Sequence, residues 1–243
     1  MAARVLEVAA NSLDSALAAQ AGGAGRIELC TALELGGLTP SHGEIALVRE
    51  YVKLPLYVLI RPRAGDFLYS EHERATMRRD IEACAALGCN GVVFGMLDAD
   101  GDVDMDGCSE LAAAAGRMGI TFHRAFDLVR DPARALEDII ALRAERVLTS
   151  GGARSALEGA ERIRECVAQA NGRLVVMPGA GITPGNIARI ATLTEAQELH
   201  ASAKRVHPSG MSHQPADTLD MAGGEIRTDE AQVRALMQAW ASA

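Results

Sequence analysis

The feature that most constrains this chain is a regular alternation of short apolar strands with helical segments along nearly its whole length. Eight strand-like runs start 22 to 35 residues apart, which is enough chain for one strand and one crossover helix. Crossovers of this kind keep successive strands parallel. The predicted strands span 4–10, 26–30, 56–62, 91–97, 119–126, 146–150, 173–179 and 198–203.

Helices are expected in the intervals between the strands, and two of them carry clear start signals. Ser12 and Asp131 suit N-cap positions, and Pro132 fits the first turn of its helix. The predicted helices span 12–22, 41–52, 70–88, 106–118, 131–143, 154–170, 184–192 and 229–241. The pattern therefore predicts an α/β fold built from eight similar units.

Two architectures fit eight such units, a closed (β/α)8 barrel and an open doubly wound sheet. The open fold usually has a glycine-rich phosphate turn after its first strand, and Ala9-Ala10-Asn11 stands there instead. The length of 243 residues is close to the roughly 250 typical of a barrel, and a core of that size needs no second domain. We therefore predict a single TIM-barrel domain over residues 1–243.

The segment 204–226 departs from the repeating pattern. It contains Pro208, Gly210, Pro215 and Gly223-Gly224 and has little periodicity, which predicts a long loop after the eighth strand. A loop at that position would lie over the C-terminal rim of the barrel, where the active sites of this fold are found.

Composition narrows the range of partners. The formal charge is −8 and aromatic residues make up 3%, so the chain lacks the basic surface and the stacking platforms of nucleic-acid-binding proteins. No apolar run reaches the ~18 residues of a membrane span, and the first strand begins without a signal-peptide core. We expect a cytoplasmic protein, without a membrane or nucleic-acid partner, that binds a small ion or a small anionic molecule. Association of several copies stays open.

The five cysteines are odd in number and lack the Cys-x-x-Cys spacing of zinc sites and redox pairs. They are therefore expected to be reduced. Cys84 and Cys166 fall in helical patterns and suit a core position, whereas Cys30 ends a strand that faces the barrel interior.

Alternation along the strands predicts which side chains enter the barrel. Placing Leu6, Ile27 and Phe122 against the helices turns the polar residues between them inward. The third strand is apolar on both faces, so its register stays open. The side chains predicted to point inward are Glu7, Arg26, Glu28, Cys30, Thr121, His123, Glu198, His200 and Ser202.

Such an interior is unusual, because structural barrels are filled mainly by Val, Ile and Leu. Buried charges must pair with one another or meet a ligand. One interpretation is a structural ion-pair network of Arg26, Glu28 and Glu198 near the bottom of the barrel. The other is a functional site.

The rim after the third strand is rich in charge. Arg61, Arg63 and Asp66 lie within six residues, and arginine side chains suit carboxylate or phosphate oxygens. Two glycine-containing loops, Thr149-Ser150-Gly151-Gly152 and Gly179-Ala180-Gly181-Ile182, could offer backbone N–H groups to an anion, although both also fit ordinary tight turns.

The run 119–127 brings further reactive groups to the same rim. It reads as a strand that ends in His123, Arg124 and Asp127, just before the predicted helix at 131–143. Histidine titrates near neutral pH and needs a fixed tautomer, so His123 is a candidate general acid or base that Glu28 or Asp127 would orient.

Several motifs, taken together and in order, resemble the CutC family of copper homeostasis proteins. They are Ile27-Glu28-Leu29-Cys30, Gly36-Gly37-Leu38-Thr39-Pro40-Ser41, Ile60-Arg61-Pro62-Arg63 with Gly65-Asp66-Phe67, Thr121-Phe122-His123-Arg124-Ala125-Phe126-Asp127, Val147-Leu148-Thr149-Ser150-Gly151, Gly179-Ala180-Gly181 and His200-Ala201-Ser202. The resemblance implies a TIM barrel, a cytoplasmic location and a role in copper tolerance or trafficking.

The resemblance also points to a candidate copper ligand. Cys30 matches the family's cysteine in the Glu-Leu-Cys motif, whereas some members have further cysteines where this chain has Ala9 and Ala10. Copper(I) favours thiolate and thioether ligands, so a single thiol would need support from Met96, Met177 or a histidine.

Two hypotheses of different classes follow from the sequence. The first is a cytosolic copper-binding protein that uses Cys30. The second is a TIM-barrel enzyme that acts on a small anionic metabolite, with acid/base candidates and substrate-binding candidates. The acid/base candidates are Glu7, Glu28, His123, Asp127 and His200, with His200 also a candidate metal ligand. The substrate-binding candidates are Arg61, Arg63, Asp66, Arg124, Ser150, Gly151, Gly179, Gly181 and Ser202.

Overall fold

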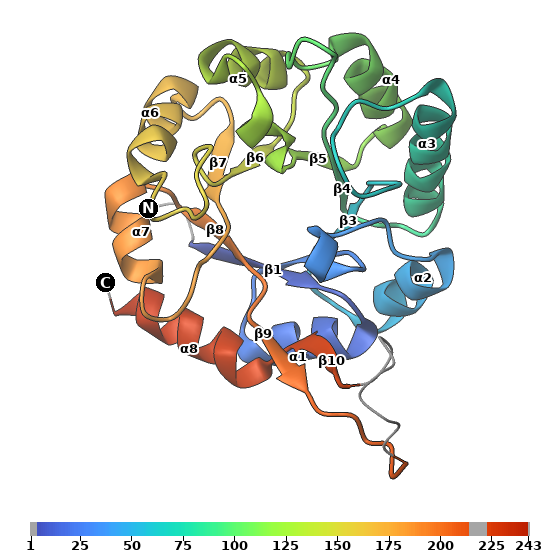
Figure 1. The fold of residues 1–243 in the computed structure, drawn as a ribbon, viewed down its shortest axis with the longest axis vertical. Helices are drawn as coiled ribbons and strands as arrows, with labels where there is room; N and C mark the ends of the chain where they lie inside the picture. Colours follow the sequence, from blue (N-terminus) through green and yellow to red (C-terminus); the bar gives the residue numbers. More distant parts are fainter. Residues whose placement is uncertain (1–3, 214–222, 243) are drawn as a thin grey trace.

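The computed structural model, which describes residues 4–213 and 223–242, is a (β/α)8 barrel as the sequence predicts (Figure 1). The barrel strands are β1 (Val5–Ala10), β2 (Arg26–Leu29), β3 (Leu56–Leu59), β4 (Gly91–Phe94), β5 (Gly119–Phe122), β6 (Arg146–Thr149), β7 (Val175–Pro178) and β8 (Glu198–Ala201). They pair in parallel in the order β7-β6-β5-β4-β3-β2-β1-β8, and β7 lies beside β8, so the ring is nearly closed.

Eight helices surround the ring. They are α1 (Leu13–Gly22), α2 (His42–Tyr51), α3 (Glu71–Ala86), α4 (Met105–Ala115), α5 (Pro132–Ala141), α6 (Ala160–Ala170), α7 (Ile187–Thr194) and α8 (Glu230–Ala241). The predicted caps are present: the Ser12 side chain accepts the N–H of Ser15 at the start of α1, and Asp131 accepts two N–H groups at the start of α5. Short 3-10 helices, η1 (Leu33–Leu35) and η2 (Arg124–Leu128), follow β2 and β5.

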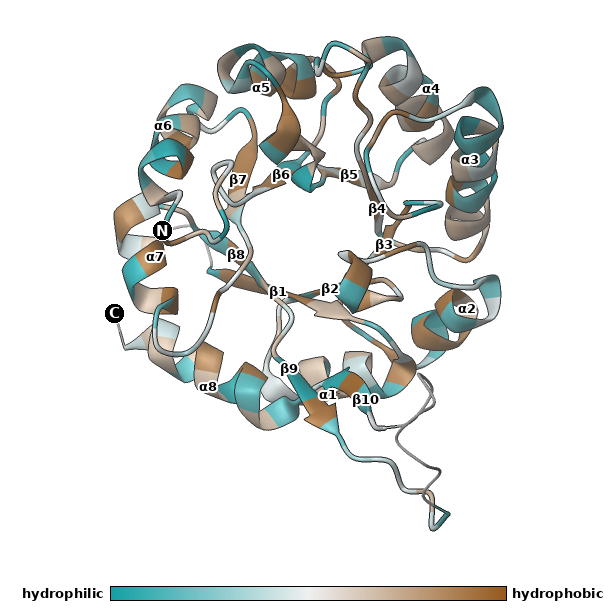
Figure 2. Cartoon of the chain, viewed as in Figure 1, coloured by the Kyte–Doolittle hydropathy of each residue, from teal (hydrophilic) through white to brown (hydrophobic). Residues whose placement is uncertain are grey.

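Alternate side chains of each strand enter two separate environments. Leu6 and Ile27 pack with the helices in the main core, as expected, and strands β4 and β7 are mainly hydrophobic in Figure 2. A second, smaller apolar cluster inside the barrel includes Cys30, Tyr57 and Leu59. The register of β3, left open by its sequence, therefore turns Tyr57 and Leu59 inward.

The prediction of a loop without regular structure over 204–226 was wrong at both of its ends. Strands β9 (Lys204–His207) and β10 (Glu225–Thr228) pair antiparallel, and Figure 1 shows them outside the ring beside α1. Side chains near the start of α1 hold β10 there: Asn11 donates to the carbonyl of Ile226 at 2.7 Å, and the N–H of Thr228 donates to Ser15 at 3.1 Å. The middle of the predicted loop, 214–222, is outside the described residues.

Two sequence-based expectations concern the chain as a whole. All five cysteines are free and buried. Among the helices of the described residues, none has the length and apolar character needed to cross a bilayer.

Candidate functional site

A cavity of about 560 Å³ opens at the C-terminal ends of the barrel strands, where TIM-barrel enzymes place their active sites. Predicted site residues that line this cavity are Glu28, Cys30, Arg61, His123, Arg124, Gly181, His200 and Ser202. Predicted site residues that are not among its lining residues are Glu7, Arg63, Asp66, Asp127, Ser150, Gly151 and Gly179. Some of the predicted site residues thus face the cavity, and the others lie outside its lining.

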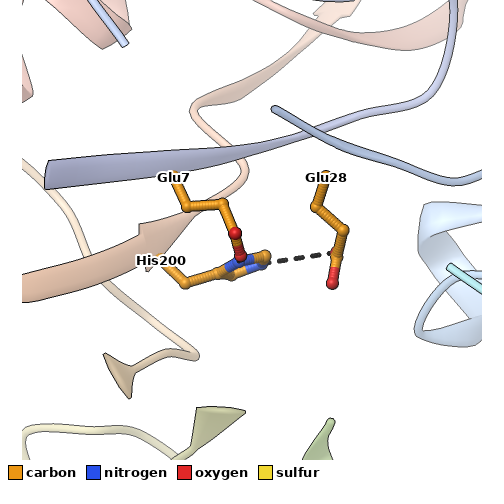
Figure 3. A group of neighbouring side chains, drawn as sticks. All are labelled: Glu7, Glu28 and His200. Atoms are coloured by element: carbon orange, nitrogen blue, oxygen red, sulfur yellow. Dashed lines mark hydrogen bonds and ion pairs between the residues drawn. The ribbon is translucent and has the colours of Figure 1, made fainter. Parts of the chain in front are cut away.

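His200 connects the two predicted glutamates of the interior (Figure 3). Its Nδ1 lies 2.8 Å from Oε1 of Glu7, and its Nε2 lies 3.8 Å from Oε2 of Glu28. Parallel pairing explains the first contact, because Glu7 of β1 is in register with His200 of β8. The three side chains form a row from the buried interior to the cavity wall, and Glu28 and His200 are the members that line the cavity.

Beneath the cavity, the interior holds an ion-pair network, although its membership differs from the prediction. Arg26 forms ion pairs with Glu7 and Glu198, and Arg146 binds the same oxygen of Glu198 at 2.8 Å. Glu7, and not Glu28, is therefore the carboxylate that Arg26 neutralises. The reason is register: Glu7 stands directly opposite Arg26 in the β1–β2 pairing.

The environments of the two glutamates separate their pKa values. Burial alone would raise the pKa of Glu7, but Arg26 and His200 outweigh it and lower the pKa to about 2. Burial raises the pKa of Glu28 to about 7, even though the charge of His200 opposes that change. Glu7 is thus permanently ionised near neutral pH, which argues against its predicted role as a second acid/base group, while Glu28 exchanges its proton in that range.

His200 belongs to the same titrating group. Burial alone would lower the pKa of its imidazole, but Glu28 and Glu7 outweigh this effect and raise the pKa above its ordinary value. Because His200 and Glu28 are neighbours, they titrate as a coupled pair.

His123 has neither of the predicted orienting partners. Its Nδ1 accepts a hydrogen bond from the N–H of Ala125 at 3.2 Å, and its ring lies 4.7 Å from the ring of Phe67. Burial, with a smaller contribution from the charge of Arg61, lowers the pKa of His123 to about 3. A histidine that stays neutral at physiological pH does not suit the predicted role of general acid or base.

Asp127 supports the rim from outside the cavity. Its carboxylate accepts hydrogen bonds from the N–H groups of Ser150 and Gly152, both at 3.0 Å, and from the hydroxyl of Thr149 at 2.5 Å. The N–H of Gly151 donates to Thr149 at 2.8 Å. The loop after β6 was predicted to offer its N–H groups to a ligand anion, but they hold this carboxylate of the chain itself.

The rim after β3 is also largely structural. The Arg61 guanidinium donates to the carbonyls of Leu35, Gly37 and Gly65 at 2.9 to 3.0 Å, so it ties two loops together while it lines the cavity. Arg63 pairs with Asp66 and Glu73 at the surface and does not line the cavity, and neither does its partner Asp66.

The loops after β7 and β8 close the other side of the cavity. Gly181 and Ser202 line it as predicted, whereas Gly179 is not among its lining residues and packs closely, since a Cβ there would lie 2.5 Å from Leu148. Sequence reasoning missed Lys204 and Gln232, which also line the cavity. Gln232 is in the first turn of α8, and only the closure of the barrel brings that turn to the mouth.

Arg124 lines the cavity with a guanidinium that is only partly used in contacts within the chain. Its Nε donates to Asp127 at 2.7 Å and its Nη2 donates to Ser150 at 2.9 Å. Its Nη1 has no hydrogen-bond partner within residues 4–213 and 223–242. Two fixed bonds therefore hold the guanidinium while one nitrogen stays available.

Comparison with known proteins agrees with this architecture. The model of the CutC family matches residues 4–205. The chain belongs to the CutC family. A family protein CutC from Xylella fastidiosa (strain Temecula1 / ATCC 700964) is 56% identical over 233 residues, which cover 96% of this chain and 87% of the relative.

Two further CutC relatives carry names that refer to copper. The mouse copper homeostasis protein cutC homolog is 49% identical over 207 residues, 85% of this chain and 76% of the relative. The crystal structure of a CutC from Streptococcus agalactiae, also named for copper homeostasis, superposes with a TM-score of 0.79 at 29% identity and covers 82% of this chain and 98% of that chain.

The described residues that line the cavity do not supply the donor atoms that copper(I) prefers. Cys30 is the one described cysteine that lines the cavity, and burial raises the pKa of its thiol well above the ordinary value, so it stays protonated. Copper(I) requires soft donors, and no second described thiol or thioether lines the cavity.

The best-grouped potential ligands are of a different kind. One ligand atom from each of Glu7, Glu28 and His200 lies within 4.8 Å of the others. These are oxygen and nitrogen donors, and Glu7 is already bound to Arg26 and His200. We therefore interpret the three residues as a proton-handling group and assign no metal to them.

Proposed function

We propose that this CutC family member is a TIM-barrel enzyme that acts on a small anionic metabolite by acid/base chemistry. The observation that carries the proposal is the contrast between two buried glutamates. Glu28 lines the cavity with a pKa of about 7, while Glu7 beneath it is held ionised with a pKa of about 2. Carboxyl groups whose environments push their pKa values apart are typical of acid/base sites.

The contacts assign a separate role to each residue of the row. Glu28 transfers the proton, because it faces the cavity and its pKa lies near the operating pH. The Glu7 carboxylate accepts the Nδ1–H of His200 and so directs Nε2 toward Glu28. His200 then holds or exchanges the proton that Glu28 releases. Arg26 is a positioning residue that keeps Glu7 ionised.

The charge of the cavity wall favours an anionic substrate. Three permanent cations, Arg61, Arg124 and Lys204, line the cavity, and Glu28 is the one carboxylate among its described lining residues. This local balance is opposite to the net charge of −8 of the whole chain. An arginine that is held in place, such as Arg124, suits a carboxylate or phosphate group.

Conversion of a bacterial metabolite extract in deuterated water tests this proposal. The wild-type protein should change specific small anions or label them with deuterium, as mass spectrometry would reveal. Glu28→Gln should slow that reaction by roughly 10²- to 10⁴-fold, the usual contribution of a general acid or base. The matched variant Glu82→Gln, in an exposed ion pair on α3, should retain the full rate. Equal rates for wild type and Glu28→Gln would contradict the proposal.

Copper handling is the second candidate, favoured by the name of the mouse relative and by the Cys30 thiol at the cavity wall. Copper(I) affinity, measured against a competing chelator, tests it. Tight copper(I) binding that is lost in Cys30→Ser but kept in the buried control Cys166→Ser would favour copper handling over the acid/base function. The acid/base proposal expects both variants to bind copper(I) as weakly as the wild type.

The proposal includes a cytoplasmic location. Five free, buried thiols are in keeping with a reducing compartment.

A further inference from the structure

His123 has an arrangement that the acid/base proposal does not use. It is the N-cap of η2, and the backbone N–H of Ala125 donates to its Nδ1 at 3.2 Å. A neutral imidazole has one donor nitrogen and one acceptor nitrogen. Because Nδ1 accepts, the ring proton is on Nε2, and His123 is a hydrogen-bond donor through that atom.

This donor has no acceptor in the described part of the chain. Nε2 is buried and has no hydrogen-bond partner among the described residues. His123 as a whole is only 5% exposed, and it lines the cavity. Buried N–H groups are nearly always paired in folded proteins, so an orphan at a cavity wall indicates a ligand atom that accepts.

The surroundings of His123 keep the ring neutral. Phe67 packs against one side, Gly95 lies so close on another that a Cβ there would be 2.7 Å from Nδ1, and the charged group that acts on the ring is the Arg61 guanidinium. Burial and that charge lower the pKa to about 3. A neutral N–H of this kind suits an uncharged carbonyl oxygen on which negative charge develops during reaction.

His123 and the proton-transfer pair face the cavity from different strands. His123 follows β5, which lies across the central opening of the barrel from β1, and Glu28 and His200 belong to the two neighbours of β1 (Figure 1). A substrate bound between them would have one end near His123 and the other near Glu28.

We propose that His123 donates Nε2–H to a carbonyl oxygen of the substrate, which makes the substrate a small anionic carbonyl compound. This inference rests on the proposed acid/base function. The Glu28 carboxylate takes a proton from the carbon next to the carbonyl: the C–H bond breaks, an O–H bond forms on Glu28, and the electron pair moves to the carbonyl oxygen. The resulting enolate oxygen accepts the His123 hydrogen bond, and return of the proton from Glu28 completes the cycle.

Two small anions that differ only at the carbonyl test the assignment. Pyruvate has a carbonyl next to its carboxylate, and propionate has a methylene group at the same position. Calorimetry should show that the wild type binds pyruvate about three- to tenfold more tightly than propionate, the range expected for one neutral hydrogen bond. His123→Phe should abolish this preference, and His123→Gln, which keeps an N–H donor, should retain part of it.

Two further readouts keep the test independent of folding and of turnover. Unchanged propionate binding by His123→Phe would show that the cavity is intact. Nitrogen-15 NMR of the wild type should show the Nε2–H tautomer of His123 at pH 7. Equal or absent binding of the two anions by the wild type, a preference that survives in His123→Phe, or an Nδ1–H tautomer would overturn the inference. None of these results depends on the Glu28-dependent conversion, so the two proposals can fail separately.

Discussion

The two sides of the barrel interior solve the problem of buried polar groups in different ways. On the side formed by β1, β2 and β8, Glu7 contacts both Arg26 and His200, so its buried charge has partners. On the side formed by β3 to β5, Thr121 and His123 are buried, and each has a polar atom without a hydrogen-bond partner in the described structure. One side therefore pairs its buried charges with one another, and the other also contains neutral polar groups that lack a hydrogen-bond partner in the described structure.

The two histidines differ in pKa for the same reason. Both were predicted to face the interior as acid/base groups, but carboxylates raise the pKa of His200 while burial and Arg61 lower that of His123 to about 3. The partners within reach, and not the residue type, decide whether an imidazole carries a proton.

The largest expected effect is on the charged side. Arg26→Ala leaves the buried Glu7 without its cation and Glu198 with Arg146 alone, and removal of one partner from a buried ion pair typically costs about 3–5 kcal/mol of unfolding free energy. Thr121→Val, on the neutral side, removes an unpaired hydroxyl at nearly constant volume, so it should be neutral or stabilising. Urea unfolding of both variants provides the comparison, and a similar loss in the two would show that the sides do not differ.

A smaller effect is expected at the rim beside β5 and β6, where Asp127 binds backbone N–H groups that were predicted to bind a ligand. Asp127→Asn weakens charge-assisted hydrogen bonds to Ser150, Gly152 and Arg124, which should lower the unfolding free energy by about 1.5–3 kcal/mol. The control is Asp66→Asn, whose exposed ion pair with Arg63 should contribute about 0–1 kcal/mol. If Asp127→Asn were as stable as the wild type, the carboxylate would have another purpose.

The third prediction is a pair of opposite pH dependences on the charged side. The folded pKa of Glu28 is raised, so its contribution to stability is fully present below about pH 4.5 and falls as the pH rises toward 7. The folded pKa of Glu7 is lowered, so its contribution is present above about pH 4.5 and falls as the pH drops toward 2.

The directions of these two pH dependences can be checked by measuring the unfolding free energies of the wild type, Glu28→Gln and Glu7→Gln between pH 3 and pH 7.5. The advantage of the wild type over Glu28→Gln should shrink with rising pH, and its advantage over Glu7→Gln should grow. Two curves with the same slope would mean that both glutamates occupy similar environments.

The fold and the inward-facing residues could be predicted because both depend on local periodicity. The period of strand and helix specifies the barrel, and alternation along β2 and β8 turns Glu28 and His200 inward. A sequence pattern does not contain the register between strands. For this reason Arg26 was predicted to pair with Glu28 and Glu198, while the pairing of β1 with β2 brings Glu7 opposite Arg26 in place of Glu28 and the pair with Glu198 is present.

Contacts between loops could not be predicted from the sequence either. Arg61, Asp127 and the loop after β6 have the residue types of an anion site, but most of the carbonyls and N–H groups that occupy them come from segments more than 20 residues away in the sequence. The strands β9 and β10 escaped prediction because they lie outside the repeating strand and helix pattern and their position depends on side chains at and just before the start of α1.

A titration of the Glu28 carboxyl by carbon-13 NMR in glutamate-labelled protein tests most directly whether Glu28 exchanges its proton near neutral pH. The resonance of Glu28 is assigned from its absence in Glu28→Gln. The account predicts a midpoint near pH 7 for Glu28, because burial raises its pKa to about 7, while Glu7 stays ionised from pH 4 to pH 8. A midpoint near pH 4.5, the ordinary value for a glutamate, would contradict the account, because a carboxyl group of that kind would have no proton to exchange at neutral pH.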